Sequence, residues 1–337
     1  MRNVKNSHPK SILVTGGAGY IGSHMVLRLA SQGWHPITLD DLSNGHRDAV
    51  LAGDFYQGDL QDAGLLDRIF SKHRIYAVMH FAAKMVVGES IIDPAIYYRS
   101  NVAATMELLD AMRRHKVHYI VCSSTAATYG LPNYAPIDEK HPNHPISPYG
   151  GTKLMMEQML ADYEKAYGIR YGCLRYFNAA GADVHGRLGE RHRPQTHLIP
   201  LVLDVALGVK SHINIYGTDY DTPDGSCVRD FVHVEDLCDG HLLLLEYLEG
   251  GGKRRVFNLG TGKGYSVKEV VDMCAKITQR PIKQLPMPRR AGDPSSLIAD
   301  GNVAISELNW KPRYPDLETI ISHAWQRRLA NVKVDVT

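Results

Sequence analysis

Tyr149 and Lys153 are the residues whose types and spacing first point to chemistry. They stand four positions apart at the start of a predicted helix, so both side chains lie on one helical face. Tyrosine titrates near pH ~10, and a nearby ammonium group favours the phenolate. The hydroxyl run Ser123, Ser124 and Thr125 follows a predicted strand earlier in the chain. These residues predict a phenol that removes a proton from a substrate hydroxyl to which Thr125 is also hydrogen-bonded.

A glycine-rich turn near the N-terminus predicts a dinucleotide site. Gly16, Gly19 and Gly22 recur at intervals of three, after a predicted strand at 11–15 and at the start of a predicted helix at 20–30. A diphosphate must approach the backbone amides at such a helix N-terminus, where a Cβ would block it. A tight turn without a ligand is the alternative, but the strand–turn–helix setting favours a cofactor.

Asp40 follows the next predicted strand, at 36–39. A carboxylate at this place accepts hydrogen bonds from the adenosine ribose hydroxyls and repels a 2′-phosphate. No arginine occupies position 40 or 41, so the sequence favours NAD over NADP. Asp41 could instead cap a turn without contacting the cofactor.

The elements that must position these residues alternate along the first half of the chain. Short apolar strands are predicted at 55–56, 77–81, 119–122 and 171–174, and amphipathic helices at 65–72, 103–115 and 152–167. This alternation is typical of an α/β fold with a doubly wound parallel sheet of the Rossmann type.

The pattern changes after about residue 180. A segment rich in Gly, Arg and His (179–195) and a polar loop (217–225) precede a predicted strand at 231–234 and helix at 236–248. We therefore predict an NAD-binding domain at 1–178, to which the chain returns at about 229–262. A smaller C-terminal substrate-binding domain takes most of 179–337.

The composition is that of a globular enzyme, with 44% hydrophobic and 22% charged residues. The formal net charge of +2 gives no broad case for nucleic acid or a membrane surface. The five cysteines form no C-x-x-C pair, which predicts neither a disulfide framework nor a zinc site. The polar segment 1–10 lacks the apolar stretch of a signal peptide, and no apolar run is long enough to span a bilayer. A cytoplasmic location is expected.

Several motifs together resemble the extended short-chain dehydrogenase/reductase family. They are the glycine turn, Phe81-Ala82-Ala83, the hydroxyl run before Tyr129-Gly130, and Tyr149 with Lys153. Within that family, further blocks resemble the UDP-galactose 4-epimerases, also called UDP-glucose 4-epimerases. These blocks lie at 175–178, 217–220, 228–234, 258–262, 289–293 and 308–310, and the resemblance runs from about residue 10 to residue 325.

The resemblance implies an NAD-dependent isomerase that interconverts UDP-glucose and UDP-galactose by inversion at sugar C4. Tyr149 would take the proton of the 4-hydroxyl while hydride passes from C4 to the nicotinamide. The resulting 4-keto sugar would turn over and receive the hydride on its other face, without net redox change. Family members form homodimers through the helix at 152–167 and the one beginning near Tyr98, so a homodimer is expected here.

The cofactor contacts that the resemblance implies involve the glycine turn, the strand ends and the catalytic helix. They are Gly16, Gly19, Tyr20, Ile21, Gly22, Asp40, Asp41, Leu42, Ser43, Asn44, Gly45, Asp59, Leu60, Phe81, Ala82, Ala83, Lys84, Ser100, Asn101, Ser123, Tyr149, Lys153 and Phe177. Some relatives have a cofactor-contacting lysine at the position of Met85, whereas here Lys84 comes one residue earlier. An asparagine that lies near the nicotinamide in relatives matches Ser100 here. Ser100 is followed by Asn101, and either residue could make that contact.

The implied substrate contacts are Thr125, Tyr149, Asn178, His197, Leu198, Asn214, Ile215, Tyr216, Arg229, Arg290, Asp293 and Leu297. Arg229 and Arg290 suit a diphosphate because guanidinium makes paired, charge-assisted bonds to phosphate oxygens; a surface ion pair is the alternative for each. Leu297 matches a position that gates the sugar pocket in relatives. Leucine is intermediate in size there, so weak use of N-acetylated or pentose sugars is expected beside the main activity.

Two other functions compete with epimerisation. A nucleotide-sugar 4,6-dehydratase needs an acid and a base directly after the threonine, and a decarboxylase needs a glutamate there, but this chain has Ala126 and Ala127. A cofactor-binding regulatory protein without catalysis has no need of a paired Tyr149 and Lys153. Among the histidines, His80, His192 and His197 show no metal-ligand spacing with a carboxylate, so no metal is expected.

Overall fold

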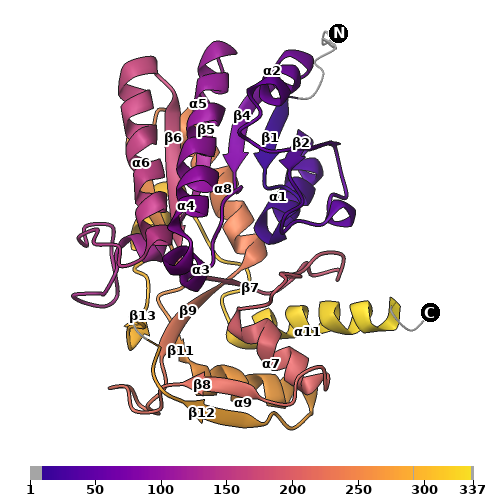
Figure 1. The fold of residues 1–337 in the computed structure, drawn as a ribbon, viewed down its shortest axis with the longest axis vertical. Helices are drawn as coiled ribbons and strands as arrows, with labels where there is room; N and C mark the ends of the chain where they lie inside the picture. The colour runs from indigo at the N-terminus through magenta and orange to yellow at the C-terminus, as the bar shows by residue number, and fades with distance from the viewer. Residues whose placement is uncertain (1–9, 291, 335–337) are drawn as a thin grey trace.

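The computed structural model describes residues 10–290 and 292–334, which form two lobes stacked along the long axis of the molecule (Figure 1). The predicted absence of a signal peptide rests on a segment that lies, apart from Lys10, outside the described residues. So does Ala291, within the block at 289–293.

The first lobe is built on a seven-stranded sheet in which all the strand pairs are parallel. The strand order is β10-β6-β5-β4-β1-β2-β3. The bounds are β1 (Ser11–Thr15), β2 (His35–Asp40), β3 (Asp54–Gln57), β4 (Ile75–His80), β5 (Tyr119–Thr125), β6 (Arg170–Tyr176) and β10 (Val256–Leu259). The expectation of a doubly wound, Rossmann-type sheet is confirmed.

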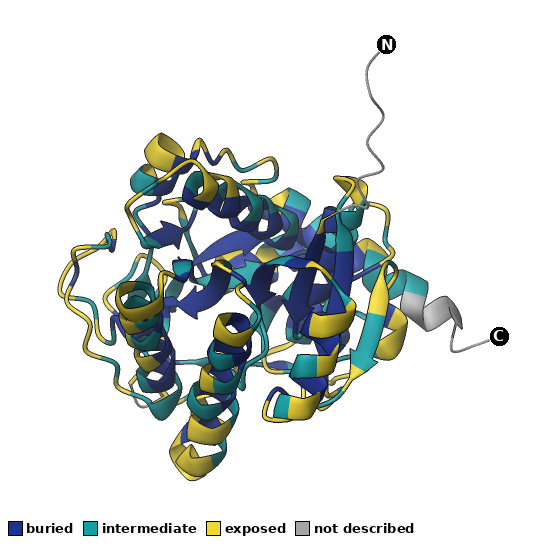
Figure 2. Ribbon diagram, turned by 90° about the horizontal axis from the view of Figure 1, so that it is seen from above, coloured by how far each residue is buried: buried dark blue, intermediate teal, exposed yellow. Residues whose placement is uncertain are grey.

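Both faces of this sheet are buried, because neighbouring side chains along a strand point to opposite faces. Leu13 packs beneath α2 (Ala63–Lys72), α5 (Ala104–Arg114) and α6 (Pro148–Tyr167), with Leu66, Leu108 and Met156. Ile12 and Val14 point to the other face, in a cluster that includes Met25 of α1 (Tyr20–Ser31) and Leu244 of α8 (Val234–Glu249). Figure 2 shows the buried strands between these helical layers.

Short elements join β4 to α5 at the carboxyl edge of the sheet. They are α3 (Val87–Ile92), α4 (Pro94–Tyr97) and a π-helical turn (Tyr98–Ala103). Two short 3₁₀ turns, Arg47–Ala49 and Ala126–Thr128, follow β2 and β5. Single π-helical turns recur at functional sites in proteins, and this one carries Ser100 and Asn101.

The second lobe contains a four-stranded and a two-stranded sheet packed with helices. The strands are β7 (Asn178–Ala180), β9 (Val228–His233), β11 (Gly264–Ser266) and β13 (Ser296–Leu297) in one sheet, and β8 (Ile213–Tyr216) with β12 (Gln284–Met287) in the other. The helices are α7 (Leu198–Ala206), α9 (Val267–Thr278) and α11 (Leu317–Val334). Val202, Val270 and Ile320 meet in the core of this lobe.

The chain returns to the first lobe through α8 and β10, and α10 (Asn302–Leu308) packs against both of these elements. The predicted return at 229–262 includes β9, which the structure places in the sheet of the second lobe. Sequence periodicity marks β9 as a strand but does not say with which strand it pairs. In the described part of the chain, no helix combines the length and apolar character needed to cross a bilayer.

Candidate active site

The glycine turn is closed by backbone contacts that only glycine permits. Gly16 has φ +71°, and a Cβ on it would lie 2.6 Å from the backbone nitrogen of Ala82. A Cβ on Gly22 would lie 2.1 Å from the carbonyl oxygen of Gly16. The first glycine therefore lets β1 turn beside the end of β4, and the third lets α1 pack against the turn.

The start of α1 offers free amides to a ligand. Its N-cap is Gly19, and within the described structure no side chain caps this helix end. The first N–H groups of a helix lack partners inside the helix, and together with the helix dipole they favour an anion. Gly19, Tyr20, Ile21 and Gly22 all line the pocket at this point. The turn thus fits a dinucleotide diphosphate.

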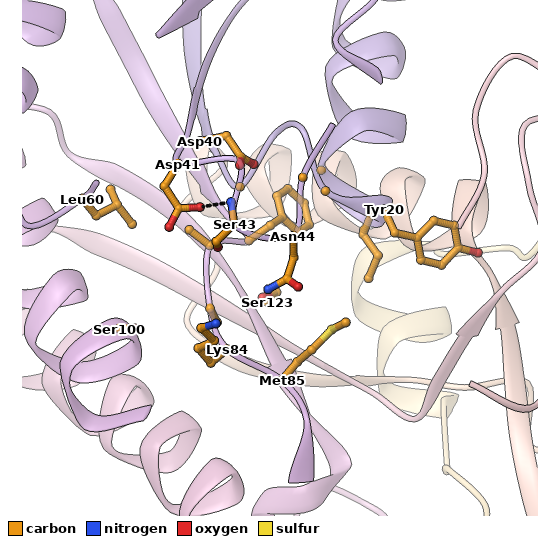
Figure 3. A pocket seen from close by; sticks show the side chains of 18 of the residues that line it. Tyr20, Asp40, Asp41, Ser43, Asn44, Leu60, Lys84, Met85, Ser100 and Ser123 are labelled. Carbon is orange, nitrogen blue, oxygen red and sulfur yellow. Dashed lines mark hydrogen bonds between the residues drawn. The ribbon is translucent and has the colours of Figure 1, made fainter. Parts of the chain in front are cut away.

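Asp40, at the carboxyl end of β2, is buried with two amides directed at it. Ala18 N donates to Oδ2 at 2.9 Å, and Leu42 N donates to Oδ1 at 2.8 Å. Burial raises the pKa of Asp40 above its usual range, and these two bonds oppose the rise. The carboxylate still lines the pocket, where its remaining lone pairs are available to ribose hydroxyls. Asp41 is exposed and accepts from Ser43 N at 2.8 Å, as a turn cap does (Figure 3).

One pocket collects almost all the predicted cofactor residues (Figure 3). It extends from the glycine turn, past the ends of β2, β3 and β4, to the catalytic helix α6. Of the predicted set, only Leu42, Asn101 and Phe177 are absent from its lining. Residues that the sequence did not assign to the cofactor also line it: Leu39, Gly58, Met85, Ala104, Ser124, Tyr176, Ala179, His192 and His197.

The structure separates the roles of Ser100 and Asn101. Ser100 lines the pocket. Asn101 is fully buried: its Oδ1 accepts from Lys84 N at 2.7 Å, and its Nδ2 donates to Lys84 O and to Thr152 Oγ1, both at 3.0 Å. Asn101 therefore ties the segment after β4 to α6, while Lys84 and Met85 both line the pocket.

Tyr149 and Lys153 project from the first turns of α6 into the same pocket. The helix begins where Ser147 accepts a capping bond from Gly150 N at 3.2 Å, followed by Pro148 at the first helical position. Lys153 Nζ donates to Ser123 O at 2.9 Å and to Ser123 Oγ at 3.3 Å. This bond fixes the ammonium at the end of β5.

The pKa values differ from the expectation of a lysine-acidified phenol. Burial raises the pKa of Tyr149 above its usual value, while hydrogen bonding with Thr125 opposes the rise. Burial also lowers the pKa of Lys153. The Lys153 ammonium donates to Ser123, and burial is the largest influence on the pKa of Tyr149.

A buried ion pair between Glu157 and Arg175 attaches α6 to the sheet. Glu157 accepts from Arg175 Nε at 2.9 Å and from Ser124 Oγ at 2.5 Å. The Arg175 guanidinium also lies over the Tyr129 ring, at 4.7 Å. This network links α6 to the ends of β5 and β6, so the strands that carry Ser123 and Thr125 are held in register with the catalytic helix.

The predicted substrate residues lie mainly in the second lobe and its junction with the first. Arg229, on β9, donates to Asp293 Oδ1 at 3.0 Å, and the Arg290 guanidinium lies 3.8 Å from the centre of the Tyr216 ring. Ile215 is buried below this group, in the core of the second lobe. Asn214, on β8, donates to Tyr216 Oη at 3.4 Å. Two arginines and a flat aromatic ring are the groups that a uridine diphosphate would need.

Leu297 and Phe177 lie together near the catalytic strand. Both pack against a small cluster made of Ala126, Tyr129 and Ile137. Leu297 is opposite Arg229 in the pairing of β13 with β9, which places it between the arginine group and the end of β5. Asn178 donates to Asp230 O at 3.0 Å and joins β7 to β9.

The interpretation of two histidines needs correction. His192 and His197 show no carboxylate partner in the sequence, but the fold brings Glu190 to both. His192 Nδ1 lies 2.9 Å and His197 Nδ1 2.8 Å from Glu190 Oε1. Burial lowers the pKa of His197, yet the Glu190 carboxylate outweighs burial and the pKa is raised overall. His197 lines the cofactor pocket, directly before Leu198 at the start of α7.

Two pocket residues that the sequence did not assign to the cofactor differ in how they could have been found. Tyr176 ends β6 opposite Thr125 on β5, so the rule that sites form at carboxyl ends of parallel strands could have found it. His192 belongs to a loop that reaches the pocket from the second lobe, and no local signal marks it. By contrast, His80 is a core residue whose ring nitrogens contact Thr15 Oγ1 at 2.7 Å and Thr105 Oγ1 at 3.0 Å.

Comparisons with known proteins agree with this geometry. Residues 12–260 match the family model described as the NAD dependent epimerase/dehydratase family. A UDP-glucose 4-epimerase of Halalkalibacterium halodurans is 54% identical over 315 residues, which cover 94% of this chain and 94% of that protein.

Solved structures are similar over the same length. UDP-glucose 4-epimerase from Brucella ovis, in complex with NAD, is 49% identical with a TM-score of 0.92, covering 94% of this chain and 97% of that one. The enzyme from Bifidobacterium longum, in complex with NAD⁺ and UDP, is 37% identical with a TM-score of 0.90, covering 96% and 99%.

Proposed function

This chain belongs to the NAD dependent epimerase/dehydratase family, and from that premise we propose how its residues act. It is an NAD-dependent enzyme that interconverts UDP-glucose and UDP-galactose by inversion at C4 of the sugar. The observation that carries the mechanism is that Tyr149 and Lys153 line the same pocket as the glycine turn and Asp40.

NAD would be held by the free amides of α1, by Asp40 and by the residues after β3 and β4. When bound, NAD would supply the hydride acceptor and donor for inversion at C4 of the sugar. Tyr149 takes the proton of the 4-hydroxyl in the oxidation and gives it back in the reduction. Thr125 would bind the same oxygen, and the Lys153 ammonium, which is held by Ser123 in the same pocket, would favour the phenolate through its charge.

The substrate would be gripped through UDP and left free to turn at the hexose. Arg229 and Arg290 bind the diphosphate, with Asn178, Leu198, Asn214, Ile215, Tyr216 and Asp293 around the nucleotide. His197, which lines the cofactor pocket and directly precedes Leu198, would lie between the cofactor and the UDP group. Ala126 and Ala127, next to Thr125, carry no group that transfers protons, so elimination of water is disfavoured.

A direct assay tests the activity. The purified protein is incubated with UDP-galactose and no added redox partner, and the nucleotide sugars are separated and identified by NMR. We expect UDP-glucose to accumulate to a fixed equilibrium ratio. A 4-keto-6-deoxy product would show a dehydratase instead, and an unchanged UDP-galactose signal would contradict catalysis.

Use of larger or smaller sugars is a second proposal. Leu297 and Phe177 pack against the same small cluster, and leucine occupies less space there than tyrosine would. We therefore expect weak turnover of UDP-N-acetylglucosamine or UDP-pentoses beside the main substrates.

The assembly, location and domain limits are further proposals. Met155 on α6 and Met106 on α5 are each 45% exposed, and Tyr98 is 43% exposed. Apolar side chains on two adjacent helices support a homodimer through α5 and α6. Size-exclusion chromatography with light scattering tests this, and Met155→Glu should shift a dimer toward the monomer.

All five cysteines lie in the described part of the chain as buried, free thiols, which supports a cytoplasmic location. The domain limits are also a proposal: an NAD-binding domain at 1–178, with a return at about 229–262 in which β9 pairs within the second lobe.

A further inference from the structure

Two groups of metal-ligating side chains occur among the described residues. One is Glu190 with His192 and His197, which belongs to the pocket already described. The other consists of His35, Asp54 and His73 and lies elsewhere. His35 begins β2 and Asp54 begins β3, whereas Asp40 at the opposite end of β2 lines the cofactor pocket. This second group, the His35–Asp54–His73 cluster, therefore sits at the amino edge of the sheet, away from catalysis.

The three side chains converge from different elements. His35 Nε2 lies 3.0 Å from Asp54 Oδ2, and His73, directly after α2, places Nδ1 3.9 Å from the same oxygen. All three donor atoms lie within 4.8 Å of one another. Zinc binds such donors at about 2.0–2.2 Å, so a tetrahedral site needs them about 3.3–3.6 Å apart. The two measured separations bracket that value, and small side-chain rotations are enough to reach it.

Tyr56 fixes the orientation of the His73 ring. Its hydroxyl lies 2.7 Å from His73 Nε2, which leaves Nδ1 directed at Asp54. Metal-binding histidines usually have their second ring nitrogen held in this way by an outer partner. The His73 side chain is 10% exposed, while His35 and Asp54 are 37% and 49% exposed. The His73 ring is thus buried, whereas His35 and Asp54 are open to solvent, from which an ion and a water ligand can enter.

The donor set combines the Asp54 carboxylate with two imidazoles, which bind metals through their unprotonated nitrogens. Lys72, whose Nζ lies 5.5 Å from the centre of the Tyr56 ring, is a neighbouring positive charge that opposes cation binding.

We propose that His35, Asp54 and His73 form a binding site for a divalent transition-metal ion of the Zn²⁺ class, with water as the fourth ligand. Two imidazoles and one carboxylate favour such ions over Mg²⁺ and Ca²⁺, which prefer all-oxygen ligands. A bound ion would join the starts of β2 and β3 to the end of α2. Because the cluster lies at the far edge of the sheet, binding leaves the cofactor pocket unchanged.

The test is calorimetric titration of the NAD-loaded protein, without a polyhistidine tag, with ZnCl₂ in a non-chelating buffer. We expect one saturable site, no heat with MgCl₂, and a higher Tm in the presence of Zn²⁺. His73→Ala and Asp54→Asn should weaken Zn²⁺ binding by at least about 10-fold, and Tyr56→Phe by about 10-fold through the loss of the outer hydrogen bond. Circular dichroism and retained NAD establish that each variant is folded.

Matched variants in the other cluster decide between the two locations. His192→Ala and Glu190→Gln should leave the Zn²⁺ affinity unchanged. The proposal is overturned if these variants abolish the site, if His73→Ala and Asp54→Asn bind as well as wild type, or if the wild type shows no saturable heat. With Co²⁺ in place of Zn²⁺, the visible absorption of a tetrahedral site should appear in wild type and vanish in Asp54→Asn.

Discussion

The cofactor side and the substrate side of the active site are built from different interactions. Around the glycine turn the contacts are short and are mostly made by backbone groups. Examples are the close approach of Gly22 to Gly16 and the hydrogen bonds from the backbone amides of Ala18 and Leu42 to the Asp40 carboxylate. Around Arg229 and Arg290 they are ion pairs and cation–π contacts between side chains. The first set is rigid before a ligand binds, and the second can exchange partners.

This difference matches what an epimerase requires. A cofactor that is oxidised and reduced within one turnover must stay in place, and a preformed backbone cradle holds it without reordering side chains. A substrate must enter, turn and leave, and arginine side chains can release Asp293 or Tyr216 for a diphosphate and then return to them. If the two sides are built independently, single substitutions should damage one side and leave the other intact.

The largest effect is expected from Tyr149→Phe. Loss of the phenol removes the group that transfers the 4-hydroxyl proton, so kcat should fall by about 10²–10⁴-fold. The cofactor cradle is untouched, so NAD retained after purification, measured by absorbance after denaturation, should equal that of wild type. Near-normal turnover would show that another group is the base.

Lys153→Met should change the pH dependence of the reaction. Burial raises the pKa of Tyr149, so the phenolate is formed only as pH rises through that value, and activity should increase with pH. Removing the ammonium withdraws its stabilisation of the phenolate, which should move the rising limb of kcat/KM up by about 1–3 pH units. The measurement is a pH profile of both proteins. An unshifted limb with uniformly lower activity would mean that Lys153 only positions Ser123.

Arg229→Ala should damage the substrate side alone. The variant loses the guanidinium proposed to bind the diphosphate, and a hydrogen bond to a charged group contributes about 1.5–3 kcal/mol, so KM for UDP-galactose should rise strongly. The matched control is Asp293→Asn, which leaves the arginine in place and should have a smaller effect. Steady-state kinetics and NAD content are measured on both. Loss of NAD in Arg229→Ala would contradict the separation of the two sides.

Gly22→Ala should damage the cofactor side. Its Cβ would lie 2.1 Å from the Gly16 carbonyl oxygen, so α1 must shift, at a cost of about 1–3 kcal/mol in overpacking. We expect lower NAD retention and a lower Tm that added NAD partly restores. Gly33→Ala is the control with open space: its Cβ meets nothing within 4 Å, so any loss there comes only from its φ of +80°.

The smallest effect is expected from Leu297→Tyr. The larger ring should narrow the space above the cluster of Ala126, Tyr129 and Ile137. Turnover of UDP-N-acetylglucosamine should fall by about 10-fold, the lower end of the 1–3 kcal/mol by which pockets discriminate small groups. Turnover of UDP-galactose should change little. Equal rates of wild type and variant on the N-acetylated sugar would remove Leu297 from the gate.

The sequence by itself determined the parallel α/β sheet, the glycine turn, Asp40 and the pair Tyr149 and Lys153. Each of these depends on interactions that are local or periodic. Glycines are needed where the backbone is close to itself, helical spacing puts two side chains on one face, and alternating strands and helices can bury their apolar sides only as a layered fold.

Only the tertiary structure decided which side chains face one another across elements. It placed Ser100 in the pocket while Asn101 braces Lys84, and it brought Glu190 to His192 and His197. It also directed Lys153 at Ser123, and it buried Tyr149, which raises the pKa of the phenol. These outcomes depend on loop paths, strand partners and desolvation, which are set by contacts between residues far apart in the chain and leave no periodic signal in the sequence.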